Sequence, residues 1–163
     1  MIPKATSCSC VSPSDPFDLA RFVRAQQPDY DRALAELRAG RKRTHWMWYI
    51  FPQLAGLGRS VMAQRYAISG LPEAQAYLRH DVLGPRLVAC ATAVRDLEGR
   101  SAHEIFGSPD DLKLRSCATL FAQVSADRVF VQLQQQYFDG QGDPDTLRRL
   151  RQAPARISDD HSG

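Results

Sequence analysis

Hydrophobic residues recur along most of the chain at intervals of three and four positions, the spacing that places side chains on one face of an α-helix. The clearest example is the segment 29–39, which Gly40 follows as a typical C-terminal cap. The strand-like run 46–51 is short and ends at a proline. The pattern therefore predicts an all-α protein with no significant sheet. The apolar positions of the segment 29–39 are Tyr30, Ala33, Leu34 and Leu37.

Capping residues divide the chain into short segments. Asp15 and Ser108 each precede a proline, which is typical of a helix start. Thr44 is expected to cap a short helix, and Ser101 with Glu104 forms a capping box. We therefore expect a compact orthogonal-type bundle of seven to eight mostly short helices, which is too many for a simple four-helix bundle.

The length of 163 residues is typical of a single domain. We expect one helical domain over 15–151, with flexible tails over 1–14 and 152–163, because both ends are poor in residues to bury. The sequence contains no run of 18 apolar residues, so it predicts no membrane-spanning helix. The N-terminal residues lack the apolar core of a secretory signal. These features predict a cytoplasmic protein without a membrane contact.

The chain carries a formal net charge of +3, which is too small to indicate a nucleic-acid partner by itself. Only Lys4, Lys42 and Lys113 are lysines among 21 basic residues. This arginine bias is explained either by the codon usage of a GC-rich genome or by selection for bidentate anion binding. Because lysines are rare, Lys42 and Lys113 are of special interest.

Cysteine and histidine are not spaced as metal ligands are. Cys8 and Cys10 form an isolated Cys-x-Cys, and the histidines are far apart in sequence. Cys90 and Cys117 lie in apolar helical patterns and are expected to be reduced thiols of the core. The sequence therefore predicts no metal site, no cofactor and no structural disulfide.

The segment 40–60 differs from the rest of the chain. It contains both tryptophans, Trp46 and Trp48, next to Tyr49, and three consecutive cations at 41–43 precede them. Aromatic residues at such density are commonly core residues. Alternatively, the rings form a pocket wall that stacks a planar ligand, while the cations hold an anion.

A second polar stripe is predicted on the helix that follows Ser108. Lys113, Ser116, Thr119 and Gln123 are spaced as residues on one side of a helix. The stripe is either an ordinary solvated face or the opposite wall of a cleft.

Together, the two segments predict a pocket for a small anionic molecule, around residues 42–60 and 108–119. A nucleotide or an ADP-ribose-like molecule fits a combination of rings and cations best. His45 is the candidate general acid or base, Lys113 is a second candidate catalytic residue, and Asp111 would orient one of them. Whether the site is catalytic stays open. The expected ligand-binding residues are Lys42, Arg43, Trp46, Trp48, Tyr49, Gln53, Ser60, Ser116 and Thr119.

Two alternatives remain. The aromatic run, or the apolar face of the last helix, would dock a partner protein. Alternatively, basic residues beside stacking rings would bind single-stranded nucleic acid. The exposure of the tryptophans discriminates between these hypotheses. Rings on the surface favour a protein partner, rings that line a concave pocket favour a ligand, and enclosed rings favour neither. The basic residues in question are Arg38, Arg41, Lys42, Arg43, Arg148, Arg149 and Arg151.

Several motifs match one family. They are Gly40-Arg-Lys-Arg-Thr-His-Trp-Met-Trp-Tyr-Ile-Phe-Pro-Gln53, Gly56-Leu-Gly58, Ala67-Ile68, Glu73-Ala74, Tyr77-Leu78, Phe106-Gly107, Asp111-x-Lys113-Leu114-x-Ser116, Thr119-Leu-Phe121 and Phe138-x-Gly140. In these residues, the chain resembles the domain-of-unknown-function 1810 family of small bacterial and fungal proteins. The resemblance covers about residues 15–150. It implies a mainly helical fold and no established activity. Some members carry a calpastatin-like label, but a compact helical domain is unlike that disordered inhibitor.

Overall fold

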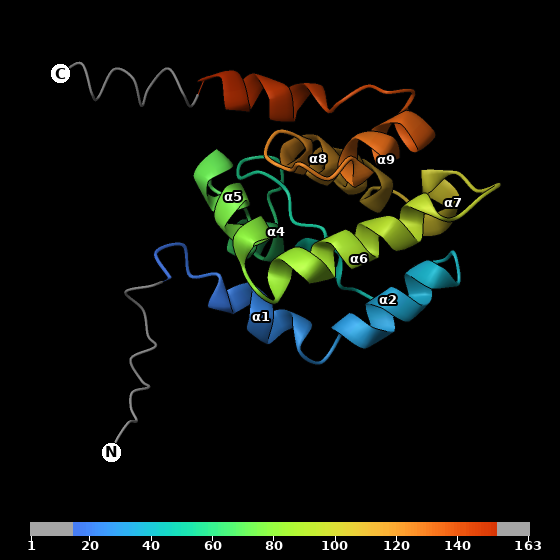
Figure 1. The fold of residues 1–163 in the computed structure, drawn as a ribbon, viewed down its shortest axis with the longest axis horizontal. Coiled ribbons are helices and arrows are strands. Elements are labelled where there is room, and N and C mark those ends of the chain that lie inside the picture. Colours follow the sequence, from blue (N-terminus) through green and yellow to red (C-terminus); the bar gives the residue numbers. More distant parts are fainter. Residues whose placement is uncertain (1–14, 153–163) are drawn as a thin grey trace.

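The computed structural model describes residues 15–152, and within this range the protein is built from helices (Figure 1). The predicted tails, including Cys8 and Cys10, lie outside the described residues. The labelled helices are α1 (Ala20–Gln26), α2 (Tyr30–Arg38), α3 (Met47–Ile50), α4 (Val61–Arg65), α5 (Leu71–Arg79), α6 (Leu83–Arg95), α7 (Ala102–Phe106), α8 (Asp110–Ala122) and α9 (Val129–Phe138). Residues 144–152 are also helical.

The predicted all-α class is confirmed. In the part of the chain that the structure describes, extended pairing amounts to an isolated parallel bridge between Leu54 and Ile68. The helices are more numerous than the seven or eight we expected, because α1 to α9 and the helix over 144–152 make ten within residues 15–152. No helix between residues 15 and 152 has both the length and the hydrophobicity needed to cross a membrane.

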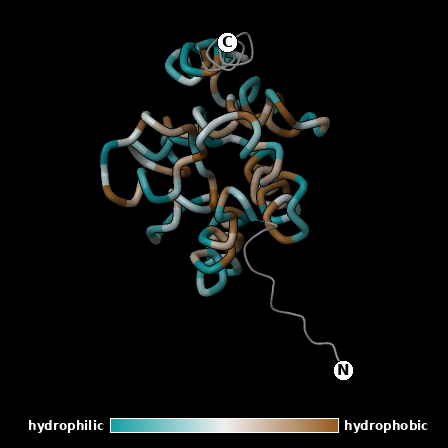
Figure 2. The backbone as a smooth tube through the Cα atoms, turned by 90° about the vertical axis from the view of Figure 1, so that its left-hand side faces the viewer, coloured by the Kyte–Doolittle hydropathy of each residue, from teal (hydrophilic) through white to brown (hydrophobic). Residues whose placement is uncertain are grey.

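Helices α6 and α8 form the centre of the bundle. Helix α6 packs against α2, α5 and α9, and α8 packs against α5, α7 and α9. Leu87, Ala91 and Val94 of α6 are fully buried at the spacing that the sequence predicted. Hydrophobic and hydrophilic residues alternate along the helical turns in Figure 2, as expected for helices that bury one face.

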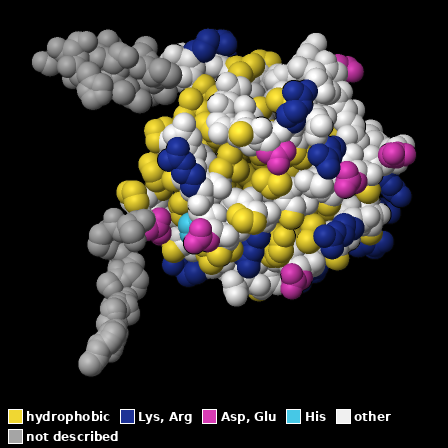
Figure 3. All heavy atoms as spheres, in the orientation of Figure 1, with side chains coloured by type: hydrophobic (Ala, Val, Ile, Leu, Met, Phe, Trp, Pro, Cys, Tyr) yellow, Lys and Arg dark blue, Asp and Glu magenta, His cyan; other side chains and the backbone are white. Residues whose placement is uncertain are grey.

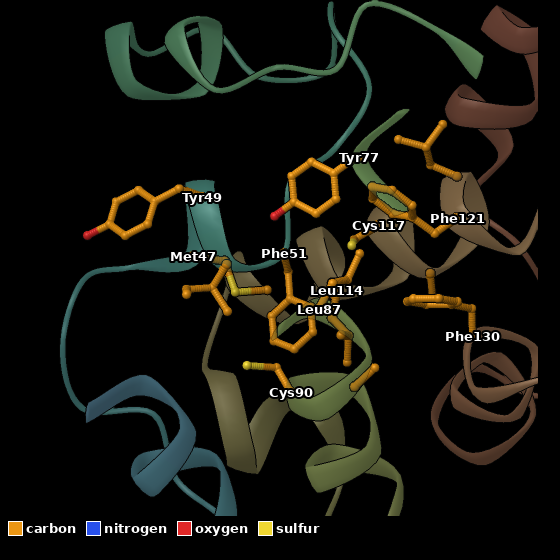
Figure 4. Packing of buried hydrophobic residues seen from close by; sticks show 14 of the residues in the cluster. Met47, Tyr49, Phe51, Tyr77, Leu87, Cys90, Leu114, Cys117, Phe121 and Phe130 are labelled. Carbon is orange, nitrogen blue, oxygen red and sulfur yellow. The ribbon is translucent and has the colours of Figure 1, made fainter. Parts of the chain in front are cut away.

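The core is continuous from the aromatic segment to α9. Figure 4 shows Phe51 directed toward Leu87, while Tyr49 points away from them. On the other side, the ring of Phe121 lies 5.4 Å from that of Tyr77 and 5.7 Å from that of Phe130. Burial of such large rings contributes strongly to the hydrophobic stabilisation of the domain. Cys90 and Cys117 are free and buried in this core, as predicted.

Some predicted helix starts are displaced. Helix α1 begins at Ala20, and the Asp15 carboxylate accepts hydrogen bonds from the N–H groups of Leu19 and Ala20, at 2.7 and 3.0 Å. Pro109, not Ser108, is the N-cap of α8, and it has no side-chain cap.

The capping box of Ser101 and Glu104 is confirmed, with both reciprocal hydrogen bonds present at the start of α7. The predicted cap at Thr44 is wrong, because α3 starts after Trp46. The Thr44 hydroxyl is instead engaged by a carboxylate of α2.

Candidate functional site

The loop 40–46 begins where α2 ends. Gly40 has a φ of +84°, a conformation that glycine adopts at little cost, and this reverses the chain after α2. The N–H of Arg41 then donates to the carbonyl oxygen of Glu36 at 3.1 Å, and that of Lys42 donates to the carbonyl oxygen of Ile105 at 2.7 Å. The loop is therefore fixed at one end to α2 and beside α7.

The Glu36 side chain organises the rest of this loop. Its carboxylate accepts hydrogen bonds from the N–H groups of Arg43 (2.8 Å) and Thr44 (3.1 Å). It also accepts from the Thr44 hydroxyl at 2.7 Å and from Nε1 of Trp46 at 2.9 Å. Burial disfavours the charged carboxylate, but these hydrogen bonds dominate and lower the pKa of Glu36 to about 2. Glu36 is thus a permanently charged anchor at neutral pH.

Lys42 and Lys113, which lie 71 positions apart in the sequence, meet at one carboxylate. Nζ of Lys42 lies 3.0 Å from Oδ2 of Asp110, and Nζ of Lys113 lies 3.3 Å from Oδ1. Each carboxylate oxygen therefore holds one ammonium group. The side chain of Lys42 is only 8 % exposed and that of Lys113 is 23 % exposed, so Lys113 is the more accessible cation.

Each of these lysines also lies near a tryptophan ring. Nζ of Lys42 is 5.1 Å from the ring centroid of Trp46, and Nζ of Lys113 is 5.4 Å from that of Trp48. Both distances are in the range of a cation–π interaction. We call Lys42, Trp46, Trp48, Asp110 and Lys113 the lysine–tryptophan site.

The three rings of the predicted pocket wall differ in accessibility. Trp46 is completely enclosed and Tyr49 is 6 % exposed, so neither presents a face to a ligand. The Tyr49 hydroxyl donates to the Asp29 carboxylate. Trp48 is half-buried and packs against the core. Of the predicted aromatic wall, Trp48 alone combines an accessible ring with a neighbouring cation.

The predicted catalytic residues do not all come together. Asp111 lies near the lysine–tryptophan site, but its Oδ2 is 3.6 Å from Nδ1 of His103, an exposed residue of α7. His45 is exposed, and its carbonyl oxygen lies 3.3 Å from the Tyr49 hydroxyl oxygen. Arg43 is also exposed, whereas the neighbouring Lys42 side chain is directed inward. The three consecutive cations therefore do not converge on one point.

Half of the polar stripe on α8 is internal, because Ser116 and Thr119 are buried whereas Gln123 is exposed. The Ser116 hydroxyl donates to the carbonyl oxygen of Leu112, and that of Thr119 donates to the carbonyl oxygen of Arg115. Thr119 is fully enclosed and also accepts a hydrogen bond from the N–H of Asp143 at 2.8 Å. Its role is to hold the segment before residues 144–152, and it lines no cleft.

Gln53 and Ser60 have structural contacts of their own. The Gln53 carbonyl oxygen accepts the N–H of Ile68 at 2.9 Å. Ser60 is the N-cap of α4, where its hydroxyl accepts from the N–H of Ala63. Neither residue forms a hydrogen bond or an ion pair with the lysine–tryptophan site.

Glu36 and Asp110 contribute to the candidate site but were not among the predicted site residues. Asp110 lies three positions before Lys113, which is the spacing of a helical ion pair. Glu36 lies beside Leu37 on the otherwise apolar face of α2, and a carboxylate on a buried face needs donors. Among residues 15–152, no three His, Cys, Asp or Glu side chains form a group that could hold a metal ion.

The fold and this site define an all-helical domain with a lysine–aromatic cluster between two sequence-distant segments. The chain belongs to the DUF1810 family, described as proteins of unknown function, and the family matches residues 16–150. This confirms the resemblance seen in the sequence. The chain is also similar to the conserved hypothetical protein Rv1873 from Mycobacterium tuberculosis, with 58 % sequence identity. The crystal structure of that protein matches this fold with a TM-score of 0.83. That match covers 84 % of this chain and 99 % of the other. The curated proteins include no match to this chain.

Proposed function

We propose that this protein binds a small anionic molecule at the lysine–tryptophan site. The observation that carries the proposal is the convergence of Lys42 and Lys113 on Asp110, beside the accessible ring of Trp48. The two ammonium groups share one carboxylate, so each is held by a single carboxylate oxygen. Lys113 has further N–H donors and the greater exposure, so it is the cation that would contact the ligand.

Stability alone is a poor explanation for this arrangement. Removing a lysine such as Lys42 from water is costly, and a buried ion pair is commonly no more stable than hydrophobic residues of similar volume. A domain that needed only packing here could use apolar side chains. Two lysines and a carboxylate beside an indole can instead bind a charged ligand that carries a flat ring, by charge-assisted hydrogen bonds and by ring stacking. Nucleotides and ADP-ribose-like molecules have both features.

The alternatives receive less support. Residues 144–152 lie on the opposite side of the molecule from the end of α2 (Figure 1), so the C-terminal arginines and the cations at 41–43 do not form one stripe. Arg148 is also paired with Asp145 at 2.8 Å. On the face shown in Figure 3, acidic and basic side chains are interspersed. The enclosed ring of Trp46 offers no surface to a protein partner. Catalysis by His45, Lys113 and Asp111, and the cytoplasmic location, stay predictions.

Intrinsic fluorescence tests the proposal directly, because both tryptophans of the chain are in the site. AMP and ADP-ribose are titrated into the wild-type protein, and a saturable change in emission is expected. Trp48→Phe should abolish most of that change, because Trp46 is enclosed.

Lys113→Ala should weaken binding by about tenfold or more, the usual effect of losing a charge-assisted hydrogen bond. Arg148→Ala is the matched control, since it removes an exposed cation that also pairs with an aspartate three positions away. Equal melting temperatures show that the variants are folded. The proposal is refuted if neither nucleotide changes the emission or the melting temperature at millimolar concentration, or if Lys113→Ala binds as well as the control.

A further inference from the structure

Asp110 does more than balance charge, because it retains unused hydrogen-bonding capacity. An ionised carboxylate has about four lone-pair positions, and the two lysines occupy one on each oxygen. The Asp110 side chain is 19 % exposed, so part of it is in contact with solvent. Building on the proposed function, we infer that Asp110 selects ligands that carry a free hydroxyl group close to their anionic group, as a sugar phosphate does.

The charges of the site explain why a hydroxyl is needed. A ligand phosphate bound by Lys113 comes close to the Asp110 carboxylate, because that carboxylate is itself 3.3 Å from the same ammonium group. Two like charges at such a separation repel each other. A hydroxyl beside the phosphate changes this, since it donates to Asp110 and forms a charge-assisted hydrogen bond.

The surroundings hold Asp110 in a position to do this. Lys42 is fixed by its backbone bond to Ile105 and by the ring of Trp46, and it holds Oδ2 of Asp110 at 3.0 Å. Asp110 is also the first residue of α8, so its backbone belongs to a helix of 13 residues. A carboxylate held in this way can discriminate between ligands, whereas a mobile one would turn away from an unfavourable group.

The three accessible groups of the site then contact three parts of one ligand. Trp48 contacts a flat ring, Lys113 contacts the phosphate, and Asp110 accepts from a sugar hydroxyl. Ribonucleotides, with a vicinal diol between the base and the phosphate, are the simplest molecules that offer all three. If Asp110 were a counter-ion only, the sugar hydroxyls of the ligand would not matter.

The test compares two ligands of equal charge and equal base, AMP and 2′,3′-dideoxy-AMP, by tryptophan fluorescence on the wild-type protein. We expect AMP to bind about tenfold more tightly or better, because a hydrogen bond to a charged group contributes at least that much. Equal affinities overturn the inference and leave the proposed function intact. Absence of binding by both ligands overturns the proposed function as well.

Two variants locate the source of the preference. In Asp110→Asn, the ratio of the two affinities should fall to about threefold or less, because an amide oxygen is a weaker acceptor than a carboxylate. In Asp145→Asn, which changes an exposed aspartate paired with Arg148, the ratio should stay at the wild-type value. A preference that survives in Asp110→Asn overturns the inference. Should that variant fail to fold, the comparison of the two ligands on the wild-type protein still decides.

Discussion

Replacing Glu36 by glutamine tests the physical origin of the loop that carries Lys42. The substitution keeps the shape of the side chain but removes the charge that accepts four hydrogen bonds from Arg43, Thr44 and Trp46. It also places an NH₂ group where one carboxylate oxygen faced N–H and O–H donors. We expect a lower free energy of unfolding with the fold retained, because the core residues around the loop are unchanged.

The magnitude follows from the pKa of Glu36. The pKa falls from 4.5, the value of an unperturbed glutamate, to about 2 in the folded protein. This difference corresponds to about 3 kcal/mol of stability at neutral pH, at about 1.4 kcal/mol per pKa unit. A lowered pKa in the folded state means that the stabilisation is complete above the unfolded-state value and is lost as the pH falls toward about 2. About 2 kcal/mol of it is lost between pH 7 and pH 3.

Urea unfolding followed by circular dichroism measures this at both pH values. At pH 7, Glu36→Gln should be about 3 kcal/mol less stable than the wild type, and the gap should narrow by about 2 kcal/mol at pH 3. Glu98→Gln, at an exposed position, is the matched control and should change stability by less than about 0.5 kcal/mol. A difference below about 1 kcal/mol at pH 7, or one that does not depend on pH, would refute the reasoning.

Three further predictions concern the framework of the fold. Arg21→Ala should lower the free energy of unfolding by about 3 kcal/mol in urea titrations, because it removes the ion-pair partner of the buried Glu73 carboxylate in α5. Arg32→Ala, which removes an exposed ion pair with Asp29, should lower it by under about 1 kcal/mol. Equal costs would contradict this. Gly84→Ala should destabilise the folded protein by about 1–3 kcal/mol and lower its melting temperature, because the alanine Cβ would lie 2.1 Å from the carbonyl oxygen of Leu78. An unchanged melting temperature would be inconsistent with that contact. Burial raises the pKa of Cys90 to about 12, so this thiol should react with iodoacetamide at pH 8 far more slowly in the folded protein than in urea, and equal rates would show that it is not buried.

Local sequence signals predicted the helices well where one short motif contains all the interacting groups. The capping box at the start of α7 needs only Ser101 and Glu104, and the end of α2 needs only Gly40. The prediction was wrong at Thr44, because a carboxylate eight positions earlier engages its hydroxyl. A cap is therefore predictable unless a residue outside the motif competes for the same group.

The candidate site shows the same limit at longer range. The rarity of lysine indicated Lys42 and Lys113, and the structure brings both to Asp110. The helical spacing of Lys113 and Thr119 gave no information about the segment that packs over Thr119. That segment includes Gly142, and a Cβ added to Gly142 would lie 3.1 Å from the Thr119 side chain. Periodicity places residues on a face, but the partner of that face is fixed by tertiary packing.

The residues of the lysine–tryptophan site come from two separate parts of the sequence. Lys42 and Trp48 precede α6, whereas Asp110 and Lys113 follow it, so neither half of the sequence contains the complete site. Between them lies Gly99, an exposed residue at which an added Cβ would meet no atom within 4 Å. A chain cleaved there would carry half of the site on each fragment. If the proposed ligand binds, its binding would report reassembly of the two fragments, as in a split-protein reporter.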